Sequence, residues 1–185
     1  MAEYYLISQL PSLDGIGDNA SIPITQERFL ELCNRFLSKK ALLQMNKLTL
    51  TPPLESEKST SALIEAWNDG ERNLRLVLGK ARADKMNKVF DLPKKDLPIE
   101  LFKVASAALE IDNPLEAEKF LLQYRLSFLE RIRPMDNFSL EFIFYYALKL
   151  MLLSRIRNFD ENLGKITYKN IYSSILNGEQ LEAKR

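Results

Sequence analysis

The run LEFIFYYALKLMLL at residues 140–153 is the feature that most constrains the fold, because Glu141 and Lys149 are its only charged residues. The run is shorter than the roughly 20 residues that a helix needs to cross a bilayer. We therefore expect a buried core helix, capped by Ser139 and continuing to about residue 163.

Apolar residues recur with helical spacing through most of the rest of the chain. Capping residues and prolines predict helices over residues 26–36, a short stretch after 38, 61–89, 99–110, 114–133 and 165–177. Asn68 and Gly70 lower helix propensity within 61–89, so a kink or break is expected there. YYLISQLPSL, residues 4–13, is the only candidate strand. The sequence therefore predicts an all-α fold, a helical bundle of six to eight helices with at most one short N-terminal strand.

The chain has 185 residues, of which 46% are apolar, and this is enough to build one hydrophobic core. We expect a single helical domain over residues 1–185. The segment FDLPKKDLP at residues 90–98 carries two prolines that end a helix. It allows a division into an N-terminal lobe, residues 1–92, and a C-terminal lobe, residues 98–185.

Residue types restrict the chemistry further, because the chain has no histidine and one cysteine, Cys33. Imidazole bases, the usual hydrolase triads and imidazole or thiolate zinc sites are thereby excluded. We expect no catalytic residue, metal site, cofactor or small-molecule substrate, and we interpret Cys33 as a small apolar residue. A helical enzyme that uses Asp, Glu or Tyr is an alternative, which would place carboxylates with raised pKa values in a pocket.

The segment GERNLRLVLGKARADK, residues 70–85, concentrates positive charge in a chain whose net charge is only +1. A helical wheel places on one side the apolar residues Leu74, Val77, Leu78 and Ala81. It places on the other side the basic residues Arg72, Arg75, Lys80 and Arg82. Leu74 and Leu78 are expected in the core. Leu76 is the exception, because it lies in the middle of the basic face. The predicted partner-binding residues are Arg72, Arg75, Leu76, Lys80 and Arg82.

Three interpretations of this basic helix, residues 70–88, are open: a solvated surface, a nucleic-acid-binding or general interaction module, and a face for a protein partner. The near-neutral net charge argues against nucleic acid. Arginine side chains around a leucine suit carboxylates of a protein partner. If the face is exposed, reversing Arg72 and Arg75 to Glu would leave the thermal midpoint nearly unchanged.

The same segment resembles a helix of the C (also called d) subunit family of V-type and A-type ATPases, through Glu71, Asn73, Leu74, Arg75 and Leu78. Three further segments, YYLISQLPSL, FLELC and FYYALKLMLLSRIRNFD, resemble a short uncharacterised bacterial family encoded within V-type ATPase operons. The chain is shorter than a standard member of the C-subunit family, which has three similar lobes. Whether it replaces such a protein or accompanies it is open.

The resemblance implies an all-helical, non-catalytic subunit or accessory of a bacterial V/A-type ATPase, coupling or assembling the complex. Its partners would be ATPase subunits of the central stalk or rotor ring, with no direct nucleic-acid contact and with membrane contact only through the complex. The single cysteine and an N-terminus unlike a secretory signal favour the cytoplasm. A peripheral position at the inner membrane would follow from the ATPase complex.

Overall fold

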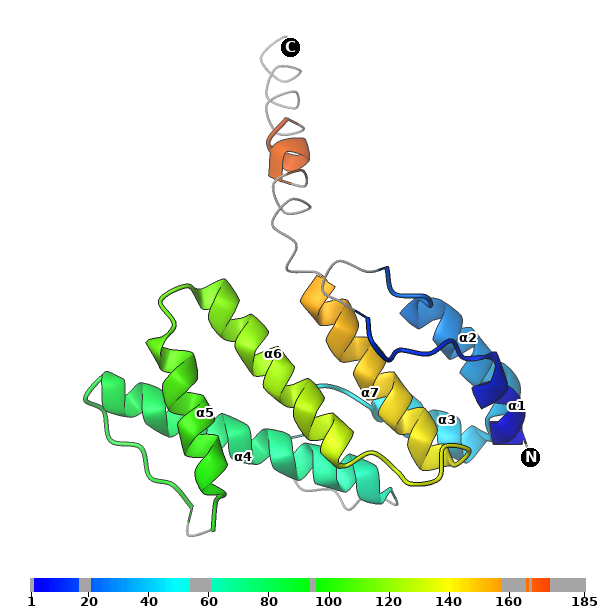
Figure 1. The fold of residues 1–185 in the computed structure, drawn as a ribbon, viewed down its shortest axis with the longest axis horizontal. Coiled ribbons are helices and arrows are strands. Elements are labelled where there is room, and N and C mark those ends of the chain that lie inside the picture. The colour runs from blue at the N-terminus through cyan, green and yellow to red at the C-terminus, as the bar shows by residue number, and fades with distance from the viewer. Residues whose placement is uncertain are drawn as a thin grey trace, which may run out of the picture.

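The computed structural model describes residues 2–16, 21–53, 61–93, 96–157, 166 and 168–173. All regular secondary structure in these residues is helical, which confirms the predicted all-α fold. In this part of the chain the helices are α1 (Ala2–Gln9), α2 (Gln26–Phe36), α3 (Lys39–Lys47), α4 (Ala62–Lys85), α5 (Ile99–Glu110), α6 (Pro114–Arg131) and α7 (Leu140–Arg157). Figure 1 shows α4 along the lower edge, with α5 and α6 leading to α7 and with α1 to α3 beyond it.

Several helices begin at the capping residues that the sequence indicates. Thr25 and Ser38 each accept a hydrogen bond from the amide three residues later. Ser61 does the same for α4, where the sequence favoured Ser59 or Thr60, outside the described residues, as the cap. Asn113 accepts one from the Leu115 amide, and Pro114 occupies the first helical position, where it has no donor to lose. These caps satisfy amides that have no partner within the helix, so local sequence fixes where the helices start.

Helix α7 is the centre of the larger hydrophobic cluster. Its side chains from Ile143 to Leu150 are buried all round, as the unbroken apolar run predicts. Leu6 of α1, Phe29 of α2 and Trp67 of α4 pack in the same cluster. Among the described residues, no helix combines the length and apolar composition that a membrane span requires.

A second, smaller cluster lies between α4, α5 and α6. Leu74 and Val77 of α4 pack there with Leu101 and Ala105 of α5 and Leu121 of α6. Helix α4 joins the two clusters, since its first half packs toward α7 and its second half against α5. Both clusters thus draw residues from each side of segment 90–98, and the division into two lobes there stays a prediction.

The expected N-terminal strand is wrong, because residues 2–9 form α1. The aromatic residues Tyr4 and Tyr5 favoured a strand, but both are more than half exposed. Leu6 is fully buried, and α1 packs against α2 and α7. A strand needs a partner strand for its backbone, and the described residues provide none, whereas a helix satisfies its own hydrogen bonds.

Two other boundaries differ from the expectation. Helix α4 continues through Asn68 and Gly70 without a break, and it ends at Lys85 rather than Val89. A Cβ added at Gly70 would lie 2.3 Å from Cζ of Phe128, so glycine allows α6 to approach α4 closely here. Tertiary packing thus outweighs the low local propensity. The expected extension of α7 over 158–163 lies outside the described residues, and the last helix is described only at 166 and 168–173.

Candidate functional site

Glu71, the first acidic residue of the basic helix, is buried with 2% of its surface exposed. Its carboxylate accepts two hydrogen bonds from Arg125 of α6, at 2.9 Å from Nε and 3.0 Å from Nη2. A third comes from Nε of Arg75 at 2.8 Å. Two guanidinium groups therefore compensate one buried carboxylate, and the arrangement fixes α4 to α6.

Arg72 and Arg75, two of the predicted partner-binding residues, have partners within the chain. Arg72 pairs with Asp69 at 3.1 Å and donates to the Pro53 carbonyl at 3.2 Å. Arg75 donates to the Thr51 hydroxyl at 3.3 Å as well as to Glu71. Both hold the segment before α4 against it. Because reversing Arg75 would place a second carboxylate beside the buried Glu71, we expect a lowered thermal midpoint, in contrast to the expectation from sequence.

The other predicted residues spread along the second half of α4. Leu76 is half-buried, and Lys80 pairs with Asp84 one turn later at 2.8 Å. Arg82 is exposed, and no hydrogen bond or ion pair joins its guanidinium group to another residue of the described ranges. Leu74 and Leu78 are buried, which confirms their predicted place in the core. The structure therefore leaves Arg82 as the guanidinium group on this helix that is most available to a partner.

The end of α4 reverses the chain through backbone hydrogen bonds. The Lys88 amide donates to the Ala83 carbonyl at 2.8 Å, and the Asn87 amide to Asp84 at 3.1 Å. Asn87 has a φ of 54°, the left-handed conformation that closes such a helix end. The chain then returns along α4, where the ring of Phe90 covers Gly79.

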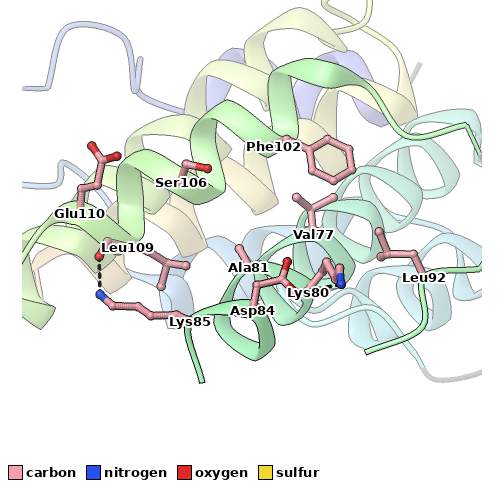
Figure 2. Close-up of a pocket in the computed structure, with 10 residues that line it drawn as sticks. All are labelled: Val77, Lys80, Ala81, Asp84, Lys85, Leu92, Phe102, Ser106, Leu109 and Glu110. Carbon is pink, nitrogen blue, oxygen red and sulfur yellow. Dashed lines mark hydrogen bonds and ion pairs between the residues drawn. The ribbon is translucent and has the colours of Figure 1, made fainter. Parts of the chain in front are cut away.

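This returning segment completes a groove of about 430 Å³ beside α4 and α5. Figure 2 shows Phe102 and Leu109 of α5 directed toward α4, Ser106 between them, the Glu110 carboxylate pointing away from α4, and Leu92 at one end. The Lys85 ammonium donates to the Leu109 carbonyl at 2.9 Å. Helix α5 has no basic residue in its last turn, so Lys85 supplies the favourable charge at that helix end.

A second polar cluster, which sequence reasoning did not single out, surrounds Lys149 of α7. Its ammonium donates to Asp14 and Glu130, each at 2.6 Å, and to the Tyr145 hydroxyl at 3.2 Å. Tyr145 in turn donates to Glu130 at 2.7 Å. The presence of a lysine in the longest apolar run was the signal for this cluster, because a buried ammonium needs acidic partners.

These contacts shift the titration of their members. The hydrogen bond from Lys149 lowers the pKa of Asp14. Burial acts to raise the pKa of Glu130, but hydrogen bonds from Lys149 and Tyr145 outweigh it and lower that pKa. Burial and the bond to Glu130 raise the pKa of Tyr145 to about 12. The charged pairs are therefore retained at neutral pH, and the cluster ties the segment around Asp14 to α6 and α7.

Neither polar cluster has the organisation of a reaction centre. The carboxylates of Glu71, Asp14 and Glu130 are bound to basic side chains, so their charge is already compensated. Cys33 is buried, and burial raises the pKa of its thiol to about 12, which agrees with its predicted role as an apolar core residue. No group of three potential metal ligands occurs among the described residues. The two polar clusters join separate segments of the fold to one another.

Comparison with known proteins places part of this chain beside an uncharacterised family. Residues 88–179 match the model of a family described as a protein of unknown function (DUF2764). The matched stretch includes α5, α6 and α7, whereas the basic part of α4 precedes it. No curated protein matches the chain. No solved structure matches it either.

Proposed function

We propose that the chain is a non-catalytic subunit or accessory of a bacterial V/A-type ATPase and acts through helical protein contacts. The proposal starts from the resemblance of residues 71–85 to a helix of the C-subunit family. The geometry gives two of the matching residues a structural role, since Glu71 is a buried ion-pair partner and Leu74 a core residue. A helix built in this way would hold its opposite face in a fixed orientation for a partner.

The observation that carries the proposal is the surface where α4 ends. Arg82 and Lys88 are exposed there, and so are the apolar side chains of Met86 and Val89, the latter at 91%. Large apolar side chains beside arginine are typical of protein interfaces. The proposed contacts lie with ATPase subunits of the central stalk or rotor ring, on the cytoplasmic side of the membrane.

The proposal is tested by purifying the tagged full-length chain from its own cells in gentle detergent and moderate salt. Mass spectrometry of the bound proteins should find V/A-type ATPase subunits in a fixed ratio. An untagged strain is the control for nonspecific recovery. Recovery of the chain alone would overturn the ATPase assignment. Recovery with nucleic acid that is lost steeply as salt rises would support the nucleic-acid-binding alternative instead.

A further inference from the structure

Two hollows lie side by side at the end of α4, separated by the side chain of Lys85. The first is the groove of about 430 Å³ that contains Phe102 and Leu92. The second, of about 250 Å³, lies between α4, α5 and the start of α6 and is lined by Arg82. Lys85 and Leu109 line both hollows, so the surface is continuous.

The two hollows differ in what they offer a ligand. Apolar atoms make up most of the first, and Phe102, which lines it, is 39% exposed. Three charged residues besides Lys85 line this hollow. Lys80 and Asp84 of α4 pair with each other at 2.8 Å, and the carboxylate of Glu110 of α5 points away from α4 (Figure 2). An apolar side chain can therefore enter the first hollow without displacing an ion pair that belongs to the fold.

The second hollow carries an excess of positive charge. Glu118 is its carboxylate, and Arg155 of α7 already binds Glu118 at 3.1 Å. Arg82 and Lys85 have no carboxylate partner among the described residues, and the exposed Lys88 lies just beyond them. A carboxylate brought to this hollow would thus meet the guanidinium group of Arg82, which no carboxylate of the described residues compensates, beside the Lys85 ammonium, which binds a carbonyl oxygen.

We propose that the paired hollows form a docking groove for an acidic amphipathic helix of a partner protein. An apolar side chain of that helix occupies the hollow at Phe102, and a carboxylate one turn away meets Arg82 across Lys85. Apolar anchors with polar neighbours at helical spacing are the usual means by which a helix binds in a groove. The inference rests on the proposed role in protein contacts and specifies the chemistry of the partner.

The test uses the purified full-length chain and a fluorescein-labelled amphipathic peptide of about 15 residues, with leucine on one face and glutamate on the other. The same peptide with glutamine in place of glutamate is the second probe. Fluorescence anisotropy should show tighter binding of the glutamate peptide. Arg82→Glu should weaken its binding at least about tenfold, because an attraction becomes a repulsion. Lys40→Glu on α3 makes the same charge change far from the groove and should leave the affinity within about twofold.

The apolar hollow is tested by filling it. Ser106 is exposed on α5 and lines the groove. Ser106→Trp should therefore weaken the binding of the glutamate peptide at least about tenfold. Ser127→Trp, at an exposed position of α6 outside both linings, is the matched control and should have little effect. Thermal midpoints near that of the wild type establish that each variant is folded.

Three results would overturn the inference: no binding of the glutamate peptide, equal affinity for the two peptides, or unchanged affinity after both Arg82→Glu and Ser106→Trp. The assay contains no ATPase component. A negative result in this assay would therefore overturn the groove assignment without affecting the ATPase proposal. Failure of the co-purification, with the peptide results as expected, would remove the ATPase proposal and leave the groove.

Discussion

Removing the buried carboxylate of Glu71 is the most informative perturbation of this fold. Glu71→Ala deletes three hydrogen bonds, two to Arg125 and one to Arg75. Arg75 is half exposed and can be solvated, whereas Arg125 is only 12% exposed. Nη1 of Arg125 is already buried without a hydrogen-bond partner, and its nearest remaining carboxylate oxygen, on Glu118, is 3.9 Å away. The change therefore leaves a guanidinium group that is buried and almost uncompensated.

Breaking a buried ion pair in this way costs about 3–5 kcal/mol. We expect a loss of about 3 kcal/mol for Glu71→Ala, at the lower end because Glu118 still lies near Arg125. With a urea dependence of about 2 kcal/mol per M, the unfolding midpoint should fall by roughly 1.5 M. Replacing both partners with apolar residues, Glu71→Leu with Arg125→Met, should recover most of the loss because no charge is then buried.

The assay is urea unfolding of each variant at constant pH, followed by far-ultraviolet circular dichroism. Glu65→Ala makes the same substitution at an exposed position of the same helix and should change the free energy of unfolding by no more than about 0.5 kcal/mol. A loss below about 1 kcal/mol for Glu71→Ala would refute the reasoning. So would a double variant that is no more stable than the single one, since the cost would then not come from an uncompensated charge.

Three other predictions concern single positions. Gly70→Ala should destabilise the fold by about 1–2 kcal/mol because the added Cβ would meet Phe128. In a Phe128→Ala background the same change should stabilise the fold by up to about 1 kcal/mol, because alanine has the higher helix propensity. Urea unfolding of the single and double variants tests this change of sign. Asp14→Asn should cost up to about 1 kcal/mol at pH 7. The pKa of Asp14 is lower in the folded chain than the value of about 4 expected when unfolded, so its ionised carboxylate stabilises the fold above that pH. The difference between Asp14→Asn and the wild type should therefore disappear as the pH falls below about 4 and through the lowered pKa. Asn87→Val should lower the thermal midpoint, by about 1–2 kcal/mol in stability, whereas Asn87→Gly should not, because φ is positive there.

Most of the helical layout could be predicted from the sequence. The caps at Thr25, Ser38 and Asn113 are local, since each involves an amide within three residues of the cap. The N-terminal helix could not be predicted from its aromatic residues. Its choice of helix over strand depends on Leu6 packing with α2 and α7, which are distant in the sequence.

The candidate site shows the same limit. The periodicity of residues 70–85 placed Leu74 and Leu78 in the core and the arginines on the opposite side. It could not indicate that Arg75 shares a buried carboxylate with Arg125, 50 residues farther along the chain. The proposed docking groove could not be predicted from the sequence either, because its walls come from α4, α5 and the segment that returns after Asn87.

The sequence by itself determined the fold class, the core position of α7 and the starts of α2, α3 and α6, because helical periodicity and capping act over one or two turns. Tertiary structure decided the N-terminal helix and the unbroken course of α4 past Gly70. It also decided which charges are compensated within the chain and which remain exposed, as at Arg82. The physical reason is separation along the sequence. Burial and ion pairing depend on residues that separate helices bring together, and the spacing of these residues in the sequence does not indicate which of them meet.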